Sequence, residues 1–441
     1  MKVITYGTFD QLHYGHIRLL ERAKALGDYL IVGVTSDNYD RNRGKINVKQ
    51  SLMERVEAVK ELNIADKIIV EEYEGQKIDD IKHYEIDIFT VGSDWIGKFD
   101  YLKQYCKVIY LDRTEGVSST QIRSNQKRIK MGLVGDDIYL AKFFRESRFV
   151  NGLEIAVLCT NLSPDVFVKE DEEEIFVTSD YEEMLEKVDA VYIHANPGAH
   201  YELTQKALLS GKDVLCEAPI SLTVSQYNEL IMLAKINGRI LMDSIRTAFS
   251  TAYERLLLLL KSGIIGDIKM IDVTCTSLKD YSMLNGWNSI CAWGPNAMLP
   301  VFQILGTNYK GKAITSMIDN NNPEYDMFTK IDFRYSHALA TIKVGQGVKS
   351  EGEMIISGTE GYVFVPSPWW KTDYFEVRFE NPENNKRYFY PLEGEGIRYE
   401  LVTFRNAIVN QRVYKCINPE VSRSFVSVIQ DFYNKKDYYD I

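Results

Sequence analysis

The spacing of apolar residues predicts alternating strands and helices in the first part of the chain. Short apolar runs predict buried strands at residues 3–6, 29–35, 67–70, 86–91 and 108–111. An amphipathic stretch at residues 17–26, closed by Gly27, predicts the first helix. A second helix is predicted from Ser51, because Glu54 completes a capping box. This alternation predicts a parallel sheet with helices on both faces, which binds ligands at the carboxyl ends of its strands.

A polar stretch at residues 124–128 separates this region from a second run of the same pattern. Further strands are predicted at residues 130–134, 153–159, 190–194 and 214–216. From about Asp267, strand-like runs with few helices between them follow at residues 269–276, 329–334, 338–344, 353–357 and 375–379. Two amphipathic helices are predicted to close the chain, at residues 398–409 and 420–433.

We therefore expect an α/β protein of three domains. Residues 1–126 would form a Rossmann-like parallel sheet, and residues 127–245 a second Rossmann domain. Residues 246–441 would form an open-sheet α/β (α+β) domain.

Composition and charge exclude several classes of partner. The 441 residues carry a formal charge of −10, which argues against nucleic acid or an anionic membrane held by bulk charge. The sequence contains no run of about 18 apolar residues, so no transmembrane helix is expected. The N-terminus lacks the features of a signal peptide, and six scattered cysteines form no CxxC pair. Reduced thiols and a cytoplasmic location are expected.

The turn after the first predicted strand carries the first candidate chemistry. His13 and His16 flank Gly15 and follow Gly7, where the strand should turn into the first helix. A helix N-terminus offers unpaired N–H groups, and imidazoles can donate hydrogen bonds to phosphate oxygens. Two histidines at a helix start can also occur by chance. Ligand-type turns at the other strand ends would favour a phosphate site over chance.

Two more ligand-type turns follow strands of the same sheet. An arginine, a glycine and three consecutive hydroxyl residues stand within residues 113–120, in a pattern suited to cradling an anion. Residues 92–95 and 97–100 follow another strand and could hold a base or a ribose. Three such turns at one edge of a sheet favour a nucleotide site over a purely structural role.

With these motifs, residues 1 to about 125 closely resemble the glycerol-3-phosphate cytidylyltransferase family, which makes CDP-glycerol for teichoic acids. The resemblance rests on HxGH at residues 13–16, RTEGxS(S/T)T at 113–120, GTFD at 7–10 and W-x-GKFD at 95–100. It implies that the phosphate monoester of a polyol attacks the α-phosphorus of CTP and releases pyrophosphate. Positioning and charge stabilisation would carry this single displacement. Asn63 departs from the arginine of typical members, so a polyol phosphate is expected rather than one named acceptor.

The resemblance implies roles residue by residue. Catalytic roles are implied for His13, His16, Lys45 and Arg113. CTP binding is implied for Thr8, Phe9, His13, Tyr14, Gly15, His16, Lys45, Asp94, Arg113, Thr114, Glu115, Gly116, Val117, Ser118, Ser119 and Thr120. Arg43 and Lys77 match positions that face the acceptor phosphate; for them and for Lys45, a solvated surface cation is the alternative. Mg²⁺ is expected with CTP, and no protein ligand to a metal is assigned.

From Arg128 onward the chain resembles the Gfo/Idh/MocA oxidoreductase family. The matching segments are residues 132–135, 196–200, 211–219 and 262–268. The resemblance implies an NAD(P) site, but Asp137 and Leu140 replace two glycines of GxGxxG, and Ala218 replaces the catalytic lysine. A later Asp-His pair falls on Ala292 and Asn296. We expect an inactive oxidoreductase-like region in which NAD(P) binding is doubtful.

Three functions remain open from the sequence. The first is a CTP:polyol-phosphate cytidylyltransferase whose degenerate second region serves dimerisation or acceptor placement. The others are a bifunctional NAD(P)-dependent reductase and cytidylyltransferase, or an inactive sensor. A homo-oligomer is expected, because both families commonly assemble. His194 and His200 are predicted to be structural, and the tryptophans at 287, 293, 369 and 370 to be core or interface residues, with a sugar or nucleotide pocket as the alternative.

Overall fold

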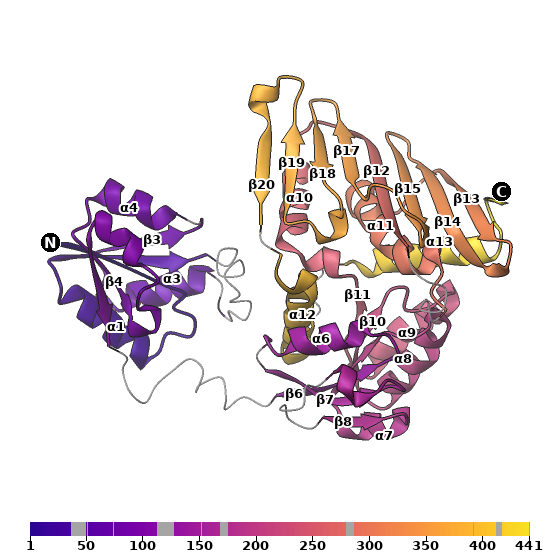
Figure 1. The fold of residues 1–441 in the computed structure, drawn as a ribbon, viewed down its shortest axis with the longest axis horizontal. Helices are drawn as coiled ribbons and strands as arrows, with labels where there is room; N and C mark the ends of the chain where they lie inside the picture. Colours follow the sequence, from indigo (N-terminus) through magenta and orange to yellow (C-terminus); the bar gives the residue numbers. More distant parts are fainter. Residues whose placement is uncertain are drawn as a thin grey trace. The chain divides into compact units, whose positions relative to one another are not determined.

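The structure is a computed structural model of the chain, drawn in Figure 1. It describes residues 1–36, 50, 52–73, 75–112, 128–150, 152–167, 175–278, 286–390, 392–411 and 417–440. The chain divides into two compact units, Met1–Lys127 and Arg128–Ile441. The further boundary near residue 245 stays a prediction.

The first unit is built on a five-stranded parallel sheet. Its strands are β1 (Lys2–Gly7), β2 (Tyr29–Thr35), β3 (Lys67–Glu71), β4 (Ile88–Gly92) and β5 (Lys107–Leu111). They lie in the order β3-β2-β1-β4-β5, so the strand order reverses between β1 and β4. A ligand of an open parallel sheet binds at such a reversal, beside the carboxyl ends of the strands.

Helices cover both faces of this sheet because successive side chains point to opposite faces, and consecutive residues of β1, β2 and β4 are buried. They are α1 (Tyr14–Lys24), α3 (Leu52–Glu61) and α4 (Gln76–Tyr84), with 3₁₀ turns η1 (Ser93–Trp95) and η2 (Asp100–Gln104). Val3 packs with Leu20 of α1 on one face, whereas Ile4 packs with Ile81 of α4 on the other. The predicted parallel sheet is confirmed, although the first helix begins at Tyr14 rather than at residue 17.

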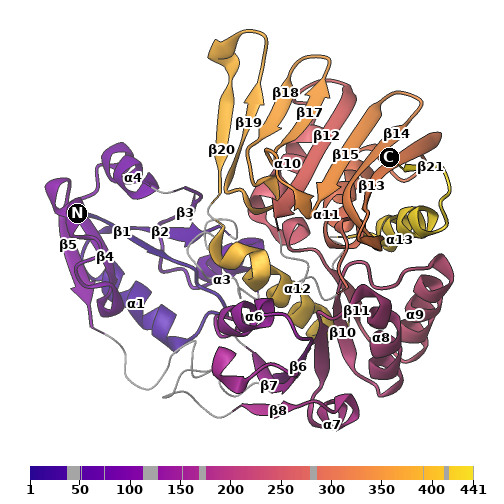
Figure 2. The same ribbon diagram turned by 45° about the vertical axis from the view of Figure 1, so that its right-hand side comes forward.

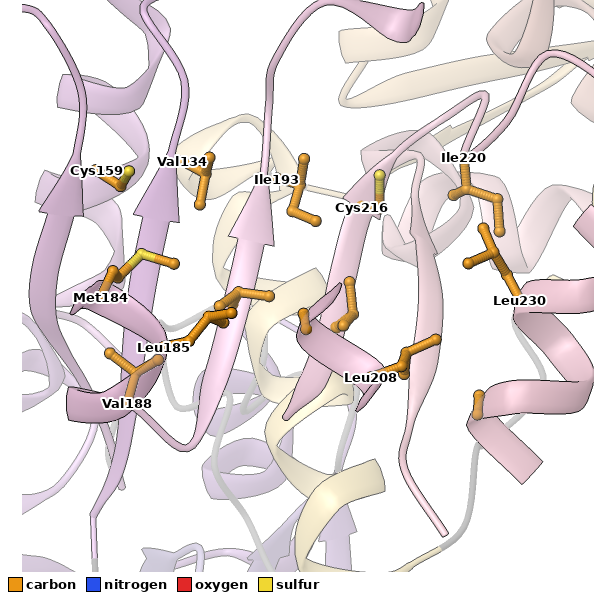
Figure 3. Close-up of a cluster of buried hydrophobic side chains, with 14 of the residues drawn as sticks. Val134, Cys159, Met184, Leu185, Val188, Ile193, Leu208, Cys216, Ile220 and Leu230 are labelled. Atoms are coloured by element: carbon orange, nitrogen blue, oxygen red, sulfur yellow. The ribbon is translucent and has the colours of Figure 1, made fainter. Parts of the chain in front are cut away.

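The second unit begins with a six-stranded parallel sheet in the order β11-β10-β9-β6-β7-β8. Its strands are β6 (Ile129–Val134), β7 (Leu153–Cys159), β8 (Phe176–Thr178), β9 (Ala190–Ile193), β10 (Asp213–Glu217) and β11 (Leu241–Ser244). Its helices are α6 (Tyr139–Ser147), α7 (Tyr181–Lys187), α8 (His200–Leu209) and α9 (Val224–Ile236). Figure 3 shows the core on one face, where Val134, Ile193 and Cys216 of the strands meet Leu185 of α7 and Leu208 of α8.

A ten-stranded mixed sheet completes the second unit. It contains β12 (Ile268–Leu278), β13 (Gly311–Asp319), β14 (Asn322–Arg334), β15 (Leu339–Gly345), β16 (Gly347–Val348), β17 (Met354–Gly358), β18 (Tyr362–Val365), β19 (Tyr374–Arg378), β20 (Lys386–Phe389) and β21 (Tyr438–Asp440). The helices around it are α10 (Thr251–Lys261), α11 (Ser289–Leu305), α12 (Ile397–Asn410) and α13 (Pro419–Tyr433). Helix α11 packs on β12, β14 and β15, and α12 packs on α6, as both ribbon views show (Figures 1 and 2).

The pattern of apolar residues missed several elements of this part, including α11, β13 and β20. Pro295 and Pro300 lie inside α11, and proline normally interrupts a helix by removing a donor. Burial of this helix against the sheet outweighs its poor local propensity. Within the described ranges, the structure contains no helix long and apolar enough to cross a membrane.

Candidate functional site

The turn between β1 and α1 is held in shape by an aromatic side chain. Phe9 has a left-handed backbone φ of 52°, and its ring is 1% exposed. A Cβ at Gly7 would lie 2.9 Å from the Phe9 ring, so this approach requires glycine. The Phe9 ring also meets the edge of His16 at a centroid distance of 5.6 Å. The predicted residues Gly7, Phe9 and His16 are therefore packed together at the carboxyl end of β1.

His13 caps the N-terminus of α1. Its backbone is extended, and its Nδ1 accepts a hydrogen bond of 3.1 Å from the Gly15 N–H. An accepting Nδ1 carries no proton, so in the neutral ring the Nε2 carries it and can donate. The His13 and His16 rings stack at 3.8 Å. Two imidazoles thus lie beside a helix N-terminus, whose N–H groups and dipole favour phosphate oxygens.

Arg55 holds this turn in place through hydrogen bonds to backbone carbonyls, and it belongs to none of the sequence motifs. The side chain is fully buried in α3. Its Nη1 donates to the carbonyls of Thr8 at 2.7 Å and Thr35 at 2.8 Å, and its Nε donates to Gln50 O at 3.2 Å. One guanidinium therefore joins the turn after β1 to the end of β2 and the start of α3. Arg55 shares the helix face of Leu52 and Val59, and an arginine within an apolar stripe is the available sequence signal.

Lys77, expected to face the acceptor phosphate, is buried at the same edge of the sheet. Its ammonium forms an ion pair with Glu71 at the end of β3. It also lies 4.5 Å above the Tyr6 ring and 5.5 Å from the Phe99 ring. Glu71 in turn accepts a hydrogen bond of 3.0 Å from the Thr35 hydroxyl. The alternative of a solvated surface cation is wrong for Lys77.

Of the other residues predicted to bind the nucleotide, some are exposed in the structure and the rest lie outside the described residues. Asp94 is exposed in η1, directly after β4 ends at Gly92, and Tyr14 is exposed at the start of α1. Arg43, Lys45 and residues 113–120 lie outside the described residues. In the described ranges, no group of three His, Cys, Asp or Glu side chains is placed to hold a metal ion.

The turn after β6 in the second unit retains one glycine of the dinucleotide motif. Gly135 has a φ of 139°, and a Cβ there would lie 1.9 Å from His194 O. Asp136 follows, and its carboxylate accepts hydrogen bonds from Asn161 N at 2.7 Å and from the Thr160 hydroxyl at 3.1 Å. The carboxylate therefore ties this turn to the end of β7. Asp137 accepts a hydrogen bond of 2.8 Å from the N–H of Tyr139, the first residue of α6.

His194 lies between two carboxylates at the end of β9. Its Nε2 is 3.5 Å from Asp137 Oδ2, and its Nδ1 is 3.6 Å from Glu217 Oε1. Burial alone would lower the pKa of His194, but these two carboxylates outweigh burial and raise it. Burial would likewise raise the pKa of Glu217, but His194 and a 2.6 Å hydrogen bond from the Tyr192 hydroxyl keep it low. His194 is therefore part of a charged cluster rather than an isolated structural histidine.

His200 has the structural role predicted for it. It is fully buried, and its ring nitrogens lie 2.8 Å from Pro219 O and 3.0 Å from Ala195 O. Burial lowers its pKa to about 4, so the ring is neutral at physiological pH.

A cavity of about 590 Å³ adjoins the His194 cluster. Trp287, Trp293 and Trp370 line it, which matches the alternative of a pocket and not a place in the core. Trp369 is buried, as expected. Trp287 stacks on His194 at a centroid distance of 5.6 Å, and Ala292 and Asn296 are also in the lining. Whether a tryptophan faces a cavity or a core depends on tertiary packing, which local spacing does not encode.

Arg246 and Glu400 are functional candidates that the sequence did not identify. The Arg246 guanidinium lines the cavity and lies 4.8 Å above the Tyr139 ring. Glu400 is fully buried in α12 and accepts a hydrogen bond of 3.1 Å from the Ser244 hydroxyl. Burial and the charge of Glu217 raise the pKa of Glu400 well above its ordinary value, although Arg246 opposes this. Burial therefore disfavours the charged form of Glu400, which lies beside Ser244 of the cavity lining.

Two family models match the chain. Residues 4–125 match the cytidylyltransferase-like model, and residues 129–244 match the model of the oxidoreductase family with an NAD-binding Rossmann fold. Glycerol-3-phosphate cytidylyltransferase of Bacillus spizizenii is 51% identical over 124 residues, which are 28% of this chain and 95% of that protein. The enzyme of the same name from Staphylococcus aureus is 46% identical over 122 residues, which are 28% of this chain and 92% of that protein.

Solved structures match the second unit. A 3-ketoreductase from Actinomadura kijaniata in complex with NADP and TDP-benzene superposes with a TM-score of 0.62. The match covers 71% of this chain and 99% of the reductase chain. An oxidoreductase from Agrobacterium radiobacter in complex with NAD⁺, L-tartaric acid and magnesium has a TM-score of 0.57, with coverages of 70% and 96%. Their identities of 15% and 16% establish the fold alone. The chain is thus a nucleotidyltransferase that belongs to the glycerol-3-phosphate cytidylyltransferase family through its first unit and continues into a unit with the Gfo/Idh/MocA oxidoreductase fold.

Proposed function

We propose that the first unit transfers CMP from CTP to a small polyol phosphate such as glycerol 3-phosphate. An oxygen of the acceptor phosphate bonds to the α-phosphorus, and the bond from this phosphorus to the bridging oxygen of the β-phosphate breaks. The products are a CDP-alcohol and pyrophosphate. The observation that carries this proposal is the stacked pair His13 and His16 at the N-terminus of α1.

The described residues can stabilise the charge that develops on the phosphates. His13 Nε2–H supplies a donor at the carboxyl end of β1, and the positive end of the α1 dipole lies beside it. Arg55 and Phe9 fix the turn that carries this donor, so it needs little reorganisation during the reaction. The family resemblance adds Lys45, Arg113 and the hydroxyl residues of 113–120 as further partners of CTP.

Lys77 is proposed to meet the acceptor phosphate. Because its ammonium already pairs with Glu71, an acceptor would share this cation or displace the carboxylate from it. The Tyr6 and Phe99 rings on either side restrict where the ammonium can move. This arrangement favours a compact acceptor phosphate at the edge formed by β1, β2 and β3.

Magnesium is proposed to accompany the triphosphate. The described residues provide no cluster of three carboxylate, histidine or cysteine side chains for the ion. CTP would therefore bring its ion on the phosphate oxygens, where the charge of Mg²⁺ offsets that of the leaving pyrophosphate. We assign no protein ligand and no catalytic step to it.

The second unit is proposed to lack hydride-transfer chemistry. A dinucleotide site needs backbone close to the pyrophosphate, but the Asp137 carboxylate and the Leu140 side chain occupy the positions of two glycines. Ala218 supplies no proton where the family has lysine. These residues do not fit NAD(P), and we derive no step through it. Homo-oligomerisation stays a prediction.

The proposal is tested by measuring pyrophosphate release from CTP and ATP across a panel of polyol phosphates, with the full chain. We expect turnover with CTP and at least one small polyol phosphate, and at least about 10²-fold less with ATP, because a site that hydrogen-bonds one base rejects another. Equal or faster turnover with ATP across the panel would overturn the cytidylyl assignment. No turnover with any polyol phosphate would overturn the acceptor class.

A further inference from the structure

A carboxylate held by three cations lies in the wall of the second unit's cavity. Glu395 Oε1 is 2.5 Å from Lys142 Nζ, and its Oε2 is 2.8 Å from Lys371 Nζ and 3.6 Å from Arg246 Nη1. All four side chains line the same cavity of about 590 Å³. Burial would raise the pKa of Glu395, but Lys142 and Lys371 outweigh it and lower the pKa to about 2. Glu395 is therefore an anion at any physiological pH.

The backbone that presents Glu395 is strained. Gly394, Glu395 and Gly396 have φ values of 58°, 51° and 88°; glycine adopts such values without steric cost, so the strain lies at Glu395. A residue with a side chain rarely adopts this conformation, and it persists only where the surroundings offset the cost. Here the attraction between the carboxylate and the three cations offsets it. The segment η9 (Glu393–Gly396) thus holds a carboxylate in an anion site at the expense of backbone strain.

The three cations suit an anion with more charge and more oxygens than a carboxylate. They come from separate parts of the fold: Lys142 from α6, Arg246 from η5 (Arg246–Phe249) and Lys371 from η7 (Trp369–Lys371). A phosphate monoester offers up to two negative charges and three terminal oxygens, enough for one oxygen per cation. The Lys142 and Lys371 side chains are about one-third exposed, so a ligand in the cavity can reach them.

The remaining cavity wall suits a short hydroxylated carbon chain. Trp287, Trp293 and Trp370 contribute aromatic surface for C–H groups, and Asn296 and Ser277 contribute polar groups for hydroxyls. A volume of about 590 Å³ fits a small ligand of this kind.

We propose that this cavity binds a small hydroxylated phosphate monoester without reacting with it, and that the phosphate displaces Glu395 from Lys142, Lys371 and Arg246. Glu395 then acts as an internal substitute for the ligand's phosphate, withdrawing with η9 when the ligand enters. Because every residue involved belongs to the second unit, this inference stands whether or not the first unit transfers CMP.

Intrinsic tryptophan fluorescence of the full chain reports on this cavity directly. Three of the five tryptophans line it, and Trp95 belongs to the first unit. Titrations in a Trp95→Phe background therefore exclude signal from the first unit's own tryptophan. The probes are glycerol 3-phosphate, a five-carbon polyol phosphate, inorganic phosphate, neutral glycerol and NADPH. We expect saturable changes with the two polyol phosphates, weaker binding of inorganic phosphate and none of glycerol.

Variants of the anion site distinguish ligand binding from a structural ion pair. We expect Lys142→Met and Lys371→Met each to weaken polyol phosphate binding at least 10-fold. Glu395→Gln removes the internal competitor and should tighten binding at least 5-fold, with Glu395→Asp between it and the unchanged chain. The matched controls are Lys349→Met, a cavity cation whose ammonium donates to Thr276 O at 3.5 Å, and Glu360→Gln on the surface; both should change affinity less than 2-fold.

Melting curves accompany every titration, so that binding is compared among folded variants. Glu395→Asp keeps the charge and serves as the test if Glu395→Gln does not fold. Unchanged or weaker binding in a folded Glu395→Gln chain would overturn the proposal. No saturable response, or equal binding of neutral glycerol, would overturn it too. Tight NADPH binding that is insensitive to Lys142→Met and Lys371→Met would reassign the cavity to the dinucleotide.

Discussion

His194 Nε2 lies 3.5 Å from Asp137 Oδ2, and this pair joins the end of β9 to the turn after β6. In a dinucleotide-binding Rossmann fold, glycine at the Asp137 position lets the backbone approach the pyrophosphate. Here the position carries a negative charge that is already engaged by a side chain of the same unit. A pyrophosphate at this turn would meet both the bulk and the charge of a carboxylate.

We therefore expect the full chain to oxidise neither NADH nor NADPH measurably with dihydroxyacetone phosphate or pentulose phosphates. Loss of a proton donor at the Ala218 position alone costs roughly 10²–10⁴ in rate. Absorbance at the nicotinamide band measures turnover, and calorimetry measures dinucleotide binding. Asp137→Gly should strengthen binding, whereas Asp165→Gly at an exposed position should not. Turnover comparable to cytidylyl transfer would instead favour the bifunctional enzyme.

Protonation of His194 should make stability depend on pH. The Asp137 and Glu217 carboxylates overcome the effect of burial and raise the pKa of His194 above its ordinary 6.5. A group whose pKa is raised by folding stabilises the protein fully below its unfolded-state pKa. This contribution is lost as the pH rises through the folded-state value. The free energy of unfolding of the second unit should therefore fall as the pH rises above about 6.5.

Urea unfolding measured from pH 6.5 to pH 9 tests this dependence, with His194→Gln as the comparison. The variant should have a flatter profile than the unchanged chain over this range. His200 does not interfere, because burial lowers its pKa to about 4 and its contribution is lost only as the pH falls below about 6.5. Parallel profiles for the two chains would mean that His194 has an unperturbed pKa.

His16→Ala should slow cytidylyl transfer by roughly 10²–10³, the usual cost of losing one donor to a developing charge. The melting temperature should barely change, because His16 is only partly buried beside the proposed nucleotide site. Initial rates of pyrophosphate release and a thermal melt measure the two effects. His83→Ala provides the matched control, since His83 is exposed in α4. Activity within about threefold of the unchanged chain would remove His16 from the phosphate site.

Arg55→Met should destabilise the first unit by about 2–4 kcal/mol, because it leaves buried carbonyl groups without their donor. Activity should fall with the loss of the turn that Arg55 holds. Urea unfolding followed by far-ultraviolet circular dichroism measures the stability. Arg18→Ala is the control, because the exposed Arg18–Glu21 pair is worth little. Equal stability of the two variants would contradict the bracing role of Arg55.

Local sequence predicted those parts of the fold that depend on local patterns. The strand predicted at residues 153–159 coincides with β7, because the apolar run 155–159 has the length of a buried strand and is too short for a helix. HxGH was placed correctly at the start of a helix, since His13 caps α1 through its own side chain. Helix α11 was missed because its two prolines oppose a helix locally, and only its packing on the sheet stabilises it.

The cavity of the second unit could not be predicted for a different reason. Lys142, Arg246, Lys371 and Glu395 are spread over more than 250 residues, and nothing in their local surroundings links them. Their convergence depends on how α12 packs against α6, where Arg398 Nε donates to Glu146 Oε2 at 2.6 Å. Long-range packing of this kind leaves no periodic signal in a single sequence.

The buried guanidinium of Arg55 has a consequence for how mutational data on this enzyme should be interpreted. It supports three separate segments through backbone carbonyls, so its replacement would lower turnover without removing any group from the reaction. A saturation screen scored by activity would rank Arg55 with His16, and an alignment would be expected to find both equally intolerant of change. A screen that also measures the abundance of folded protein would distinguish the two residues. Replacing Arg55 should lower that abundance, whereas replacing His16 should lower activity alone.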